Sequence, residues 1–206
     1  MYTKSTEQES ANRLQQVHSR KGGLSSQLTL IETAATRTAA FPRSKSTQRE
    51  MEHEASELMR ALSSSADSGA MIESLKGLMA LIERAHGATA EELAAALRRH
   101  GAVQRLCALV DDAAPSVHRR SMAILGNLVA DVFDPRASES VALASGAGVL
   151  PRLMARLGDE AFPTKLYAAA CLQNMTSIDG GVCDFLNSQG AAKVLEALLR
   201  AGDDEV

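Results

Sequence analysis

Apolar residues along residues 51–206 recur at spacings of three and four, which is the spacing of one face of an α-helix. The run 102–110 places Leu106 and Leu109 on one side, and the run from residue 116 to about 130 does the same with Val117, Ile124 and Leu128. No stretch alternates apolar and polar residues as a half-buried strand would. The pattern therefore predicts an all-α domain.

The hydrophobic pattern occurs twice. Residues 101–127, shifted by 47 positions, align without a gap on residues 148–174, and nine of these 27 positions are identical. A helical repeat of roughly 40–50 residues is typical of an α-solenoid, a stack whose long grooves hold other proteins. The identical pairs are Gly101/Gly148, Arg105/Arg152, Leu106/Leu153, Ala108/Ala155, Asp112/Asp159, Ala114/Ala161, Ala123/Ala170, Leu125/Leu172 and Asn127/Asn174.

Glycine and proline divide each copy into three helices. A glycine accepts the positive φ needed where two helices meet at a sharp angle, so we expect corners at Gly101 and Gly148. Proline is accepted in the first turn of a helix, which makes Pro115 and Pro163 start signals. The expected order in each copy is a short, a medium and a long helix: 90–99, 102–110 and 116–130, then 139–145, 149–157 and 164–176.

This arrangement resembles the armadillo repeat. The resemblance rests on Gly-Ala-Val-x-x-Leu at 101–106, Gly-Val-Leu-Pro-x-Leu at 148–153, and the endings Ala-Ile-Leu-Gly-Asn-Leu at 123–128 and Ala-Cys-Leu-Gln-Asn-Met at 170–175. A further unit begins at Gly190, and Glu83 occupies the slot of the family's Asn in the first unit. The resemblance covers about residues 52–206 and implies a right-handed α-solenoid of about three repeats, with the related HEAT repeat as the alternative.

In the armadillo family the third helix of each unit lines a concave groove, where Asn side chains hold the backbone of an extended peptide. An amide suits this role because it can donate to a C=O and accept from an N–H. The alternative is that the Asn side chains bond to the neighbouring repeat. By position, the resemblance implies a partner-binding groove that includes Asn127, Asn174, Glu83, Arg120, Tyr167 and Lys76.

One feature of the family is missing from this groove. Nuclear import receptors of the family place Trp four residues before the Asn, where this chain has Met79, Ala123 and Ala170. We therefore do not expect it to bind a nuclear localisation signal.

Composition changes near residue 50. Residues 1–50 carry 8 Lys/Arg against 4 Asp/Glu and 14 Ser/Thr, whereas residues 51–206 carry 14 Lys/Arg against 21 Asp/Glu. A polar segment of this kind buries little surface, so we expect a separate N-terminal extension over 1–50 that orders on a partner or along the repeats. The repeat domain is expected over 51–206, with units near 51–88, 89–131 and 138–177 and a partial capping unit over 180–206.

Two weak helices are expected in the extension, one over residues 6–20 and one along an apolar stripe from residue 24 to residue 35. A cleaved organelle transit peptide is the alternative interpretation. Transit peptides are poor in acidic residues, and Glu7, Glu9 and Glu32 argue against one here.

Several function classes lack their usual sequence signals. The weakly acidic body has no clustered basic face for nucleic acid, and no run approaches the ~20 apolar residues that cross a bilayer. The five His and three Cys residues show no metal-binding spacing. No Gly-rich phosphate loop or GxSxG motif occurs, so we expect no catalytic, metal or cofactor residues and no small-molecule substrate.

Other polar residues have structural interpretations. Cys107 and Cys171 lie in apolar runs and are expected in the core, Cys183 is expected to be more exposed, and Asp131 and Asp134 are expected in turns and caps. Two basic runs, Arg-Arg-His at 98–100 and His-Arg-Arg at 118–120, either bind an acidic partner or form solvated helix faces.

The sequence thus favours a non-catalytic, cytoplasmic adaptor or scaffold for protein partners in a larger complex. It would bind a partner segment in the groove and be tethered by its N-terminal arm. The alternative is a fixed structural subunit of a large assembly, such as a ciliary or cytoskeletal complex, that uses its end and convex faces.

Overall fold

The computed structural model describes residues 45–194 and residue 196. The helices expected within residues 6–35 lie outside this part, as do residue 195 and residues 197–206 of the expected partial capping unit. Every regular element among the described residues is an α-helix, which confirms the all-α class. The helices are α3 (Lys45–Ser64), α4 (Ser68–Arg84), α5 (Ala88–Arg99), α6 (Ala102–Leu109), α7 (Pro115–Leu128), α8 (Ala137–Gly146), α9 (Val149–Arg156), α10 (Phe162–Ile178) and α11 (Gly180–Ser188).

The expected order of helix lengths is wrong for the first two helices of each copy. Helices α5 and α8 have 12 and 10 residues, whereas α6 and α9 have 8 each. Helix α5 gains its length at its start, because it begins at Ala88, directly after Gly87 with φ 56°. The third helices, α7 and α10, are the longest of their copies, with 14 and 17 residues.

Local signals explain where the helices begin. Gly101 and Gly148 adopt left-handed φ values of 72° and 68° just before α6 and α9, which confirms the expected corners. Before α7, an oxygen of Asp112 accepts from the Ala114 N–H at 2.8 Å. Asp159 does the same for Ala161 before α10, at 2.9 Å. The identical Asp and Ala of the two copies thus form the same turn before each long helix.

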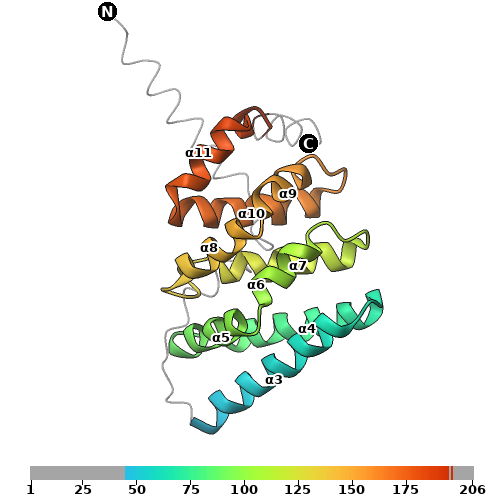
Figure 1. Cartoon of the computed structure of the whole chain (residues 1–206), viewed down its shortest axis with the longest axis vertical. Helices are drawn as coiled ribbons and strands as arrows, with labels where there is room; N and C mark the ends of the chain where they lie inside the picture. Colours follow the sequence, from blue (N-terminus) through green and yellow to red (C-terminus); the bar gives the residue numbers. More distant parts are fainter. Residues whose placement is uncertain (1–44, 195, 197–206) are drawn as a thin grey trace, which may run out of the picture. The chain divides into compact units, whose positions relative to one another are not determined.

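The long helices α4, α7 and α10 lie side by side in successive layers (Figure 1). Helix α7 packs against α4 on one side and α10 on the other, while α6 and α9 pack against α7 and α10 of their own layers. Fully buried side chains such as Leu78, Leu125 and Met175 belong to one hydrophobic core that these helices share. Each such side chain contributes about 1.5–3 kcal/mol through removal of apolar surface from water.

Hydrogen bonds from arginine side chains to backbone carbonyls also join successive layers. Arg105 donates from Nε and Nη2 to the Leu62 carbonyl, at 3.2 and 3.0 Å, near the end of α3. Its counterpart Arg152 donates to the Cys107 carbonyl at 3.1 Å, near the end of α6. Carbonyls in the last turn of a helix lack intrahelical partners and carry the negative end of the helix dipole. A cation from the next layer is attracted to this negative end, so the repeated arginine stabilises each junction.

Candidate functional site

The residues expected to line a groove lie on the three long helices. Lys76 and Glu83 on α4 are exposed, whereas Arg120, Asn127, Tyr167 and Asn174 on α7 and α10 are half-buried. Because α7 contacts both α4 and α10, all six residues lie on three adjacent helices.

The two asparagines use their amide hydrogens differently. Nδ2 of Asn127 donates to the Ala123 carbonyl of its own helix at 2.9 Å. Nδ2 of Asn174 donates across to the Gly126 carbonyl of α7 at 2.9 Å. Asn174 therefore makes the contact between repeats that the sequence left open as an alternative, and Asn127 does not. Within the described residues, neither Oδ1 has a hydrogen bond, so each amide keeps an acceptor for a further group.

The charged residues of this face have local partners. Lys76 pairs with Glu73 one turn earlier at 2.7 Å, and both side chains are largely exposed. Arg120 donates from Nη1 to the Ser116 carbonyl of its own helix at 3.1 Å. Contacts of this kind hold a side chain near its helix without neutralising the positive charge of an arginine.

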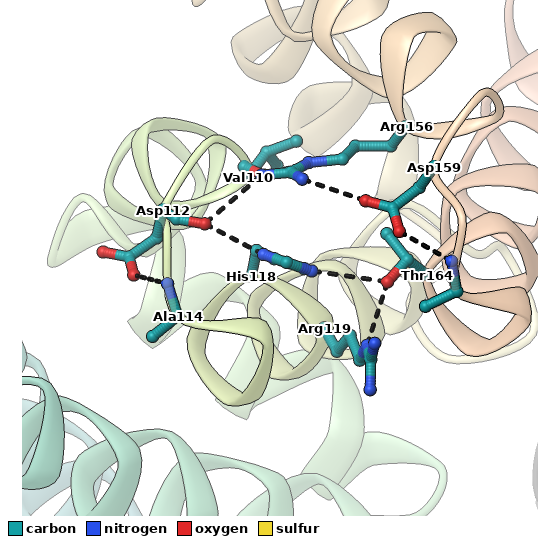
Figure 2. A network of polar contacts seen from close by, with 9 residues as sticks. Val110, Asp112, Ala114, His118, Arg119, Arg156, Asp159 and Thr164 are labelled. Atoms are coloured by element: carbon teal, nitrogen blue, oxygen red, sulfur yellow. Dashed lines mark hydrogen bonds and ion pairs between the residues drawn. The ribbon is translucent and has the colours of Figure 1, made fainter.

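A polar network joins the start of α7 to the start of α10 (Figure 2). The buried His118 lies 2.9 Å by Nδ1 from the Asp112 carbonyl and 3.3 Å by Nε2 from Oγ1 of Thr164. Nε of Arg119 donates to the same Oγ1 at 2.9 Å. A carbonyl only accepts, so Nδ1 of His118 carries a hydrogen. Thr164 accepts from Arg119 and has its own hydrogen left for Nε2, so both ring nitrogens of His118 have a hydrogen-bond partner.

Arg156 extends the network to the loop after α6. It donates to the carbonyls of Val110 at 2.9 Å and Asp112 at 3.3 Å, and it pairs with Asp159 at 3.2 Å. The Ala161 N–H that Asp159 accepts holds the pKa of this carboxyl below its ordinary value, and Arg156 acts in the same direction. This network was not predicted from the sequence, although Asp112 and Asp159 are identical in the two copies and lie in the loops that form it.

The first basic run, 98–100, has a structural role. The Arg98 side chain is 6% exposed and pairs with the fully buried Asp134, with further contacts to Ser140 at 3.1 Å and Glu139 at 3.1 Å. Arg99 pairs with Glu52 of α3. Asp134 also accepts from the Arg136 N–H at 2.9 Å, as expected of a turn residue. Its burial and its ion pair with Arg98 were not anticipated, because the two residues are 36 positions apart.

The cysteines lie where the apolar pattern placed them. Cys107 and Cys171 are buried, and Cys183 is exposed. Burial raises the pKa of the Cys107 thiol to about 12, with Arg152 opposing, and burial also raises the pKa of Cys171. Both buried thiols are therefore protonated at neutral pH and unsuited to nucleophilic chemistry.

Among the described residues, neither a metal-binding group of side chains nor a membrane-spanning helix is found. No three His, Cys, Asp or Glu side chains come together there in a way that could hold a metal ion. In the same part of the chain, no helix combines the length and apolar character needed to cross a membrane.

A cleft of about 520 Å³ opens beside α3 and α5 and was not anticipated from the sequence. Its lining includes Glu52, Glu92 and Arg99, and the ion pair of Arg99 with Glu52 lies within it. These two residues are 47 positions apart, so no local pattern brings them together. The mixture of acidic and basic groups selects no particular class of ligand.

A solved structure with a similar fold is the crystal structure of an engineered protein from the Northeast Structural Genomics Consortium. It matches with a TM-score of 0.61 and 22% sequence identity, over 79% of this chain and 68% of that chain. At this identity the likeness concerns the fold alone. No family model and no curated protein sequence matches the chain.

Proposed function

We propose that the chain is a non-catalytic adaptor that holds a segment of a protein partner on the face formed by α4, α7 and α10. In this proposal the helices form an armadillo-like solenoid in the cytoplasm, and the arm over residues 1–50 tethers the protein to a second component of a larger complex. Two tethered contacts raise the effective concentration of the partners, even where each contact is weak.

The observation that carries the proposal is the arrangement of equivalent residues on the three long helices. Each long helix carries a row of three residues that are exposed or half-buried. The rows are Lys76, Met79 and Glu83 on α4, Arg120, Ala123 and Asn127 on α7, and Tyr167, Ala170 and Asn174 on α10. Small residues in the middle of the rows on α7 and α10 allow a chain to approach the helix backbone. The Oδ1 acceptors of Asn127 and Asn174 are suited to the N–H groups of such a chain.

A bulky residue at Ala123 should block this face. We expect Ala123→Tyr to lose the proteins that the intact chain captures from native cells, as measured by affinity capture and mass spectrometry. The matched control is Ala108→Tyr, on the exposed face of α6. Both variants should keep the helical content and the melting temperature of the unmodified chain.

The fixed-subunit alternative is favoured by two exposed apolar side chains outside the proposed groove, one after the end of α7 and one at the start of α10. Val132 is 70% exposed and Phe162 is 58% exposed, and neither belongs to the rows described above. If Ala123→Tyr retains every partner while Phe162→Ser loses them, the groove proposal is wrong and the fixed-subunit function is preferred.

A further inference from the structure

The arginines of the helical stack differ in how their charges are compensated. Between Arg60 and Arg156, most arginines pair with a carboxylate. Arg105 instead donates twice to a carbonyl of an earlier helix. The two exceptions are Arg119 and Arg120. Arg119 and Arg120 are consecutive residues near the start of α7. Neither has an ion pair within the described residues, and both are half-buried.

The geometry of each guanidinium leaves donors for a further group. Arg119 uses Nε on Thr164, and Figure 2 shows the rest of its guanidinium directed away from His118. Arg120 uses Nη1 on the Ser116 carbonyl. A guanidinium has five N–H donors in a planar fork that matches a carboxylate, so most of this capacity remains available at both residues.

Acidic groups near the start of α7 are engaged elsewhere. Asp112 accepts from the Ala114 N–H, and Asp159 is held by the Ala161 N–H and by Arg156. The exposed Glu160 lies in the loop before α10. Its negative charge is balanced by Lys165 in the first turn of α10, which has no ion pair within the described residues. Arg119 and Arg120 therefore each keep their positive charge.

We propose that Arg119 and Arg120 bind the carboxylates of an acidic segment of the protein partner. This inference rests on the proposed function and names the chemistry of the partner at the same site. Arg120 precedes Asn127 by two turns of α7, or about 10 Å along the helix axis. That distance equals about three residues of an extended chain. A partner segment that places an acidic side chain at Arg120 can therefore offer a backbone N–H to Oδ1 of Asn127.

The test uses the full chain and a short fluorescein-labelled peptide of alternating Glu and Gly, with Gln replacing Glu in an uncharged control peptide. Fluorescence anisotropy at several salt concentrations gives the affinity. We expect the Glu peptide to bind and to weaken as salt rises, because salt screens partly exposed charges. Arg119→Gln combined with Arg120→Gln should weaken binding at least ~10-fold, since two charge-assisted contacts are lost.

Two controls separate the local site from net charge and from folding. Arg60→Gln combined with Lys193→Gln changes the net charge equally at two exposed positions away from α7 and should keep the affinity within about twofold. Arg120→Gln alone leaves the contact of Arg119 with Thr164 intact, so weaker binding by this variant cannot be attributed to a loosened junction between α7 and α10.

Failure of the Glu peptide to bind, or equal binding by the double variant and the unmodified chain, would overturn this inference. The two proposals can also fail separately. If Ala123→Tyr loses the native partners while the double arginine variant retains them, the groove stands and the acidic specificity is wrong. If the double variant loses the Glu peptide while Ala123→Tyr retains every native partner, the acidic site stands and the groove function is wrong.

Discussion

The Thr164 hydroxyl forms two hydrogen bonds at the junction between α7 and α10. Its Oγ1 serves both Nε of Arg119 and Nε2 of His118, and the Thr164 side chain is fully buried. The helical pattern alone places this residue at an apolar position, because the corresponding residue of the first copy is Val117. The junction between α7 and α10 thus contains a polar contact where the sequence repeat predicts an apolar one.

Thr164→Val should destabilise the chain. The substitution keeps the shape but leaves a donor of Arg119 and a ring nitrogen of His118 without their partner, which costs about 1–3 kcal/mol. Urea unfolding followed by circular dichroism measures the change. Thr176→Val is the control, because the Thr176 hydroxyl bonds only to the Gln173 carbonyl of its own helix. Equal losses of stability for the two variants would contradict the role assigned to Thr164.

At the scale of the elements, the short helices α6 and α9 depend on the backbone of the glycine before each of them. Gly148 has φ 68°, and a Cβ built there meets no atom within 4 Å. Any effect of a methyl group at this position therefore comes from the backbone conformation, since packing is unaffected. The same holds for Gly101, with φ 72°.

Gly148→Ala should lower the free energy of unfolding by about 1–2 kcal/mol, the cost of the left-handed conformation for an L-residue. Gly146→Ala is a close control, because Gly146 lies in α8 without a positive φ and its Cβ also meets nothing within 4 Å. The control should be neutral or stabilising by up to about 1 kcal/mol, since alanine favours a helix. Thermal unfolding of both variants decides between these outcomes.

The elements could be predicted to different extents. The corners at Gly101 and Gly148 and the proline-initiated starts of α7 and α10 were predictable, because each depends on the backbone preferences of one or two residues. The early start of α5 was not predicted from the apolar run, which begins only at Ala90. The turn at Asp134 was predicted, but its burial follows from Arg98, which a local pattern cannot assign to it.

At the scale of the whole molecule, the burial of Cys107 and Cys171 makes the free energy of unfolding depend on pH. Both are protonated in the folded chain, whereas an exposed thiol ionises near its ordinary pKa of 9.0. Folding raises the pKa of each thiol, so protonation of the buried thiol contributes fully to the free energy of unfolding below pH 9.0. For Cys107 this contribution is lost as the pH rises toward about 12.

Unfolding by urea in the presence of a reductant should therefore become easier between pH 8 and pH 10, by about 1.4 kcal/mol for Cys107 alone. Cys107→Ala should reduce this pH dependence by that amount, even though the cavity lowers stability at every pH. The same pH dependence in Cys107→Ala and the unmodified chain would show that the thiol is not ionising on unfolding.

Sequence alone was sufficient for the helical class, the two copies and the separation of buried from exposed cysteines. These properties depend on apolar spacing and backbone preferences within a few residues, which a linear pattern records directly. It could not assign partners across the layers: Asn174 bonds to Gly126 at a separation of 48 residues, and Arg98 pairs with Asp134 at 36. Those contacts depend on how the helices pack, and the packing also leaves Arg119 and Arg120 without carboxylate partners among the described residues.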